Sequence, residues 1–188
     1  MDFFEEDRGE RCLHHGDSRV RSMNRVLDTA ALLHWPVQEL RGGICAFSQQ
    51  EELASVSETR SLLLESAQLE WRAVPKDWLE QAKSVASISG DLPRLSDVDL
   101  DVLALAVGLS LELVTDDYRL QNAYKNHGGQ VRSVNTKGAG QVWMWELRCT
   151  GCRATFPVPS DAKRSKRGAV GECERCGSPT EIKRMKKR

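Results

Sequence analysis

Apolar positions along the chain alternate between short runs and longer stretches with helical spacing. The short runs predict four strands, at residues 24–27, 42–47, 111–115 and 130–134. The longer stretches predict helices at residues 30–35, 59–71, 76–87, 95–109 and 118–127. Because strands and helices alternate, the order favours an α/β fold, with a parallel sheet covered by helices on both faces.

The segment 95–109 is the clearest predicted helix. Ser96 is a good N-cap, and Asp99 completes a capping box in place of the usual Glu. The core stripe of this helix is expected at Leu100, Leu103, Ala104 and Val107. In the segment 59–71, helical spacing relates Leu62, Leu63 and Leu69.

A change of composition after the fourth predicted strand indicates a second, smaller module. The 188 residues leave room for one domain with a core and a small appended unit. We predict a disordered leader at 1–22, an α/β domain at 23–136, a linker at 137–141, a β-rich module at 142–182 and a basic tail at 183–188. A Cys/His cluster in the leader, Cys12, His14 and His15, is interpreted as incidental.

The net charge is zero, but it is unevenly distributed. Residues 162–188 hold ten Lys/Arg and three Asp/Glu, a balance of +7, so the rest of the chain carries −7. A basic segment attracts nucleic acid phosphates without reading sequence. The positions expected to contact RNA are Lys163, Arg164, Lys166, Arg167, Lys183, Arg184, Lys186 and Lys187. Trp143 and Trp145 are equally suited to stacking on unpaired bases and to a domain interface.

No window approaches the ~18 to 20 apolar residues of a membrane span. No basic-then-apolar signal sequence opens the chain. We therefore expect a soluble cytoplasmic protein without a membrane partner.

Four of the six cysteines form two CxxC pairs with twenty residues between them. The pairs are Cys149/Cys152 and Cys173/Cys176, and this spacing is a strong zinc signal. Four thiolates close a tetrahedral site, so the expected role is structural. Free thiols and a disulfide-linked hairpin are the weaker alternatives. Cys45 lies in an apolar run and is expected in the core.

Acidic residues lie where predicted strands end or helices begin. Asp28 follows the first strand, Asp116 and Asp117 follow the third, Asp99 opens the helix at 95–109, and Glu52 lies after the second strand. The carboxyl ends of parallel strands share one edge of a sheet, where ligands bind. Converging carboxylates repel one another unless a cation such as Mg²⁺ or Mn²⁺ lies between them. Such a cation can lower the pKa of a bound water and stabilise the charge of a phosphodiester transition state, so the site is suited to phosphodiester hydrolysis.

Each acid taken alone also has a structural interpretation. These are a helix cap for Asp28, Asp99 and Asp116, and a solvated helix face for Glu52. Asp97 and Asp101 are interpreted as surface charges that flank Asp99. The placement of all the acids together favours the metal site.

Three strings carry a resemblance to a known family: VLDTAALL (26–33), LSDVDLDVLALAVGL (95–109) and LVTDDYRLQN (113–122). Together they resemble the PIN-domain nucleases, and most closely the archaeal and eukaryotic Nob family, which matures the 3′ end of small-subunit ribosomal RNA. That family also places a zinc ribbon after its PIN domain, so the resemblance extends from residue 24 to about residue 184.

The resemblance implies roles for individual side chains. The implied catalytic carboxylates are Asp28, Glu52, Asp99 and Asp117, with Asp116 as an additional or substitute ligand. Of these, Asp28, Asp99 and Asp117 would hold Mg²⁺ or Mn²⁺. Thr29 and Thr115 would support them through their hydroxyls, and Glu51 is an alternative to Glu52.

The combined expectation is a PIN-like parallel sheet followed by a β-rich zinc ribbon, acting as a metal-dependent endoribonuclease. The resemblance implies precursor 16S ribosomal RNA on the nascent small subunit as its substrate. The main alternative is a non-catalytic zinc-ribbon RNA-binding assembly factor, in which the acids only cap helices. A toxin-type PIN nuclease is disfavoured because such chains usually stop after the PIN domain. The oligomeric state, including a homodimer, stays open.

Overall fold

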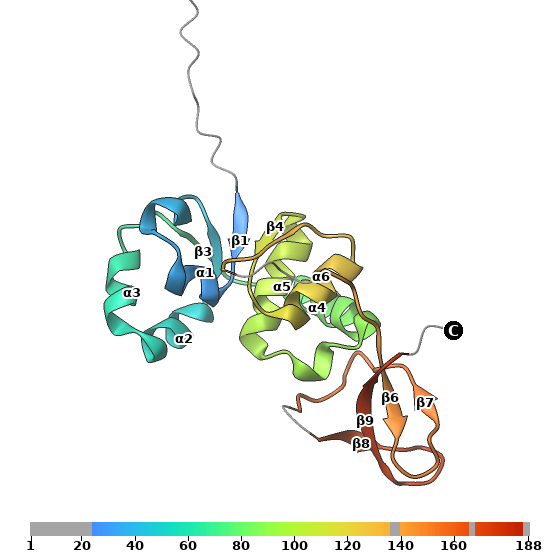
Figure 1. Cartoon of the computed structure of the whole chain (residues 1–188). Helices are drawn as coiled ribbons and strands as arrows, with labels where there is room; N and C mark the ends of the chain where they lie inside the picture. Colours follow the sequence, from blue (N-terminus) through green and yellow to red (C-terminus); the bar gives the residue numbers. More distant parts are fainter. Residues whose placement is uncertain (1–23, 136–139, 166–167, 186–188) are drawn as a thin grey trace, which may run out of the picture.

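A computed structural model describes residues 24–135, 140–165 and 168–185. The predicted leader at 1–22 and most of the predicted linker, residues 137–139, lie outside these ranges. The first described part is built on a parallel sheet in the order β3-β2-β1-β4-β5 (Figure 1). Its strands are β1 (Arg25–Leu27), β2 (Ile44–Ala46), β3 (Glu70–Arg72), β4 (Glu112–Val114) and β5 (Val131–Arg132).

Helices connect these strands and confirm the predicted α/β fold. The α-helices are α1 (Thr29–His34), α2 (Gln49–Val56), α3 (Glu58–Leu64), α4 (Lys76–Ser89), α5 (Asp97–Leu109) and α6 (Tyr118–Asn126). Two 3₁₀ turns, η1 (Val37–Leu40) and η2 (Leu92–Arg94), complete the connections. In the described residues, no helix is both long enough and apolar enough to span a bilayer.

Two hydrophobic cores lie on opposite faces of the sheet. Successive side chains of a strand point to opposite faces, so Val26 packs in the core of α4, α5 and α6, and Leu27 packs in the core of α1, α2 and α3. β2 follows the same rule, with Ile44 in the first core and the buried thiol of Cys45 in the second. The two faces confirm the predicted covering of the sheet by helices (Figure 1).

The helix α5 begins as the sequence predicts. Ser96 Oγ accepts from the backbone N–H of Asp99 at 3.0 Å, and Asp99 Oδ2 accepts from the N–H of Ser96 at 2.7 Å, which completes the capping box. Of the predicted stripe, Leu100, Leu103 and Ala104 are buried and Val107 is partly buried against the same core. The box fixes the first turn of α5, and with it the position of Asp99.

The predicted helix at 59–71 is wrong in its second half. α3 ends at Leu64, and after a turn with a left-handed Gln68 (φ 52°) the chain forms the edge strand β3. Leu62 and Leu63 are 62% and 52% exposed, so they do not belong to a core face. This strand was not predicted because it is only three residues long and only Trp71 of the three packs against a core. Its neighbours Glu70 and Arg72 form an ion pair with each other.

The second described part is a small antiparallel sheet in the order β7-β6-β9-β8. Its strands are β6 (Trp145–Cys149), β7 (Thr155–Phe156), β8 (Ala169–Glu172) and β9 (Pro179–Arg184). It lies beside α4 (Figure 1), where Leu147 and Val158 join the first core. Lys183 and Arg184, assigned above to a basic tail, are the last residues of β9.

The end of α4 accepts this second module at close range. Ser87 Oγ donates to the carbonyl of Val158 at 2.6 Å. The C-cap residue Gly90 has φ +82°, and a Cβ on it would lie 2.5 Å from the carbonyl oxygen of Trp145. Only glycine fits this conformation and this contact, so the α4 terminus is shaped to receive the start of β6.

Candidate active site

Asp28 occupies the carboxyl end of the central strand β1 and is only 7% exposed. Its Oδ1 accepts from the N–H of Thr29 at 2.7 Å and caps α1. Its Oδ2 accepts from the hydroxyl of Thr115 at 2.5 Å, and Thr115 directly follows the neighbouring strand β4. The carboxylate is therefore fixed from two strands at one edge of the sheet.

Asp117 is joined to the same hydroxyl. Its backbone N–H donates to Thr115 Oγ1 at 3.0 Å, and its Oδ1 accepts from the N–H of Arg119 at 2.7 Å, which caps α6. Thr115 thus donates to Asp28 and accepts from Asp117, so one side chain sets the spacing of two acids.

The charges of these acids interact. Burial raises the pKa of Asp28 to about 7, and the negative charges of Asp99 and Asp117 add to the rise, against hydrogen bonds from Thr115 and Thr29. Burial also raises the pKa of Asp117, and Asp99 again contributes. The structure therefore brings Asp28, Asp99 and Asp117 within electrostatic reach of one another, in a site where adding negative charge is costly.

Glu52 approaches the cluster through Thr29, whose hydroxyl donates to Glu52 Oε2 at 2.6 Å. Both Glu51 and Glu52 are exposed, and this contact with Thr29 distinguishes Glu52 from its neighbour. The fully buried Gln49 lies beneath it and was not predicted; its Nε2 donates to the Leu27 carbonyl at 3.0 Å and lies 3.4 Å from Thr29 Oγ1. A polar residue four positions before the buried Leu53, on its side of the helix, is the signal that could have revealed it.

Asp116 serves a different segment. Its Oδ1 accepts from the N–H of Val134 at 2.9 Å and its Oδ2 accepts from the N–H of Asn135 at 3.0 Å. The cap of α6 is Asp117, so the interpretation of Asp116 as that cap is wrong. The geometry therefore favours Asp117 as the member of the acidic cluster. Asp116 instead binds the backbone of the chain that follows β5.

The two acids that flank Asp99 on α5 differ from each other. Asp97 is exposed. Asp101 is partly buried and accepts from the hydroxyl of Ser48 at 2.6 Å. Asp101 therefore connects the start of α2 to α5, beyond the surface role expected of it.

The two CxxC pairs meet at one end of the antiparallel sheet. Cys149 Sγ lies 3.4 Å from Cys176 Sγ, and Cys152 Sγ lies 3.7 Å from Cys173 Sγ. Among the described residues, these four cysteines form the group of ligand atoms that all lie within 4.8 Å of one another. Tetrahedral Zn²⁺ with bonds of about 2.3 Å places sulfurs about 3.8 Å apart, whereas a disulfide needs about 2.05 Å. The arrangement suits a metal.

The described members of the set of basic positions expected to contact RNA lie on the same module as the cysteines. Lys163 and Arg164 are exposed on the loop before β8. Lys183 pairs with Glu181 at 2.7 Å, and the guanidinium of Arg184 lies 3.1 Å from the ring centroid of Trp143. The other basic positions expected to contact RNA, Lys166, Arg167, Lys186 and Lys187, lie outside the described residues.

Comparisons with known proteins extend this picture. A family model described as the PIN domain of ribonuclease matches residues 26–109. Endoribonuclease Nob1 of Methanothermobacter thermautotrophicus is 34% identical over 165 residues, which cover 83% of this chain and 90% of that protein. The chain belongs to the Nob1 family of endoribonucleases.

Other relatives agree with this placement. Endoribonuclease Nob1 of Methanocaldococcus jannaschii is 30% identical over 166 residues, covering 87% of this chain and 79% of that protein. Ribonuclease VapC1 of Thermoplasma acidophilum is 38% identical, but over 110 residues and 57% of this chain. These two Nob1 matches extend over more of the chain than the VapC1 match does.

The raised pKa of Asp28 predicts how the stability of this Nob1-family protein depends on pH without divalent cations. A carboxyl group with a raised pKa stabilises the folded state while protonated. That contribution is complete below the unfolded pKa of about 3.9 and is lost as pH rises to about 7. Between these pH values the unmodified protein should lose about 2–4 kcal/mol of its free energy of unfolding through Asp28, and Asp28→Asn should not show this loss. Thermal unfolding followed across this pH range measures the difference.

Asp97→Asn is the matched control, because it removes an exposed acid from the first turn of α5. It should keep the pH slope of the unmodified protein. An Asp28→Asn protein with that same slope would show that Asp28 does not titrate in this range.

Proposed function

We propose that this endoribonuclease is metal-dependent, uses Asp28, Asp99 and Asp117 to hold Mg²⁺ or Mn²⁺, and cleaves precursor ribosomal RNA. The observation that carries the proposal is the acidic cluster at the carboxyl edge of the sheet, linked through Thr115. By resemblance to the Nob family, the substrate is precursor 16S ribosomal RNA on the nascent small subunit, and the protein would act in the cytoplasm.

The donor set fits a hard divalent cation. Its ligands are carboxylate oxygens, which Mg²⁺ and Mn²⁺ prefer. The charges of Asp99 and Asp117 raise the pKa of Asp28 beyond the effect of burial, so a cation would relieve an existing repulsion. In the described chain the carboxylates do not form as close a group as the cysteine sulfurs. That spacing suits a cation that keeps several of its own waters.

The residues of the chain orient the ligands. The hydroxyl of Thr115 donates to Asp28 and opposes the rise of its pKa. Thr29 holds the carboxylate of Glu52 beside the cluster, where Glu52 can accept a proton or add a ligand. A divalent cation bound there supplies charge stabilisation to a phosphodiester under attack by water.

The cysteine module supports RNA binding in this proposal. Zn²⁺ bound by the four thiolates would fix the two CxxC turns. The exposed Lys163 and Arg164 would then contact RNA phosphates from a module that the metal holds rigid. A chain that binds RNA but neither binds Mn²⁺ nor cleaves RNA would instead be the non-catalytic assembly factor.

Cleavage of a short RNA that spans the 3′ end of 16S ribosomal RNA tests the catalytic assignment. Asp28→Asn and Asp117→Asn should each lower the rate on the order of 10²- to 10³-fold, because each removes a fixed charge from the site. Asp116→Asn should stay within a few-fold of the unmodified protein, since its oxygens hold Val134 and Asn135.

Asp97→Asn is the control for loss of one acid and should cleave normally. Full activity of Asp28→Asn would sink the catalytic assignment. A larger loss in Asp116→Asn than in Asp117→Asn would reverse the choice between the adjacent aspartates.

Elemental analysis tests the zinc site. The native protein should contain about one zinc per chain, and Cys149→Ser should lose most of it because three thiolates hold the ion less tightly than four. Cys45→Ala removes a buried cysteine of the sheet and should keep its zinc. Native protein with almost no zinc would refute the assignment.

A further inference from the structure

A cavity lies where the first turn of α6, directly after Asp117, meets the chain that enters β6. Its volume is about 460 Å³, which is in the range of sites for small ligands. The lining side chains that matter here are Asp91, Tyr118, Arg119, Asn122, Trp143 and Trp145. The proposed mechanism uses none of them.

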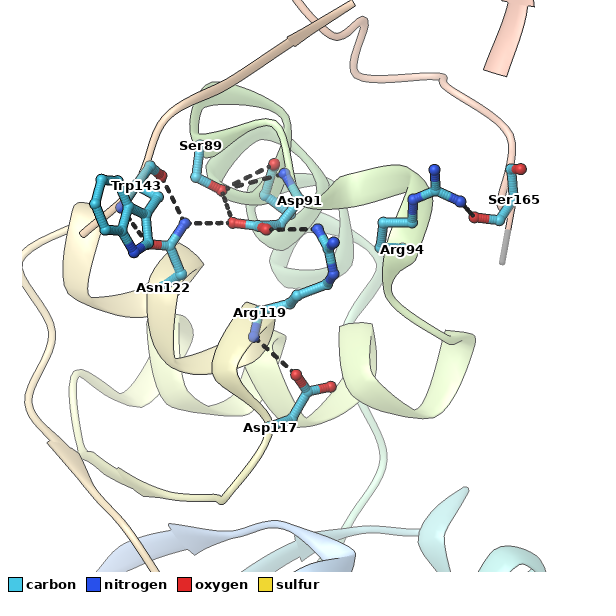
Figure 2. Close-up of polar contacts among 9 residues, drawn as sticks. Ser89, Asp91, Arg94, Asp117, Arg119, Asn122, Trp143 and Ser165 are labelled. Carbon is cyan, nitrogen blue, oxygen red and sulfur yellow. Dashed lines mark hydrogen bonds and ion pairs between the residues drawn. The ribbon is translucent and has the colours of Figure 1, made fainter. Parts of the chain in front are cut away.

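The wall of this cavity is held by a buried carboxylate (Figure 2). Asp91 is fully buried and accepts from Ser89 Oγ at 2.8 Å, from Asn122 Nδ2 at 2.6 Å and from the guanidinium of Arg119 at 3.2 Å. Asn122 also exchanges two hydrogen bonds with the backbone of Trp143, at 2.6 and 2.7 Å. These contacts connect α4, α6 and the chain that enters β6, so hydrogen bonds hold this side of the cavity in place.

The surface of the cavity combines aromatic rings with hydrogen-bond donors. The guanidinium of Arg119 lies 5.1 Å from the ring centroid of Trp145, and Tyr118 is 56% exposed. The indole Nε1 of Trp145 is buried and has no hydrogen-bond partner among the described residues. Because solvent does not reach this atom, the aromatic rings and the guanidinium of Arg119, and not Nε1, are the groups open to a ligand.

The position of the cavity relates it to the reaction. Asp117, Tyr118 and Arg119 are consecutive, so Asp117 and Arg119 lie at most about 7 Å apart along the backbone. The charge of Asp91 is paired with that of Arg119, which leaves the aromatic surface to determine what binds. A flat aromatic ring joined to a phosphodiester matches this geometry, with the phosphodiester near Asp117 and the ring beside Tyr118 and Arg119.

We propose that this cavity binds one unpaired nucleobase of the RNA, next to the phosphodiester at the acidic cluster. The base stacks against Tyr118 and the Trp145–Arg119 pair. This inference rests on the proposed function, because it takes RNA as the substrate. It makes the site favour single-stranded RNA, since a paired base enters only at the cost of unpairing and unstacking.

Binding of short RNAs that each lack one base tests the proposal. The parent is Asp28→Asn, so that cleavage does not interfere, and fluorescence anisotropy reports affinity. One abasic position should weaken binding about tenfold. Tyr118→Ala and Trp145→Ala, made in this parent, should bind the intact RNA more weakly and show little further loss at that position.

Phe47→Ala is the matched control, because Phe47 is an aromatic residue of similar exposure, 51%, outside the cavity. It should keep the penalty at the same position. Equal penalties in all variants, or no position with a penalty, would overturn the proposal. RNA binding with the predicted pattern, but without metal-dependent cleavage by the unmodified protein, would instead refute the proposed function alone.

Discussion

The hydroxyl of Thr115 connects two members of the acidic cluster. It donates to Asp28 and accepts from the backbone N–H of Asp117. Because Thr115 directly follows β4, which pairs with β1, sheet pairing brings it to Asp28. Helix α6 begins directly after its N-cap residue, Asp117, whose backbone N–H donates to this hydroxyl. The proximity of Asp28 and Asp117 is thus a consequence of strand order, and a change in register between β1 and β4 would separate them.

The structural and functional interpretations of the acids turn out to be compatible. Asp28 caps α1, Asp99 completes the box of α5, and Asp117 caps α6. Each cap orients its carboxylate, and a carboxylate oxygen that accepts one N–H keeps a lone pair. A cap therefore preorganises a potential ligand. Where a helix directly follows a parallel strand, as α1 and α6 do, the acid that caps the helix also lies at the carboxyl edge of the sheet.

Local signals explain how much of the site could be predicted from the sequence. Asp28, Asp99 and Asp117 stand at strand and helix ends that are readable from hydrophobic period, and the CxxC spacing marks the sulfur site. The edge strand β3 was missed because only Trp71 of its three residues faces a core. Asp116 and Asp117 could not be separated, since the partners of Asp116 follow a later strand. The buried Asp91 network was invisible because it joins α4, α6 and the ribbon entry through tertiary contacts alone.

The central claim is that Asp28, Asp99 and Asp117 form one cation site. Calorimetric titration with Mn²⁺ of zinc-loaded unmodified protein, Asp99→Asn and Asp116→Asn tests it most directly. Asparagine at 99 can still accept from the N–H of Ser96, so the capping box survives while the charge is lost. The account predicts that Asp99→Asn weakens Mn²⁺ binding by about tenfold or more, and that Asp116→Asn binds like the unmodified protein. Unchanged affinity in Asp99→Asn would contradict it.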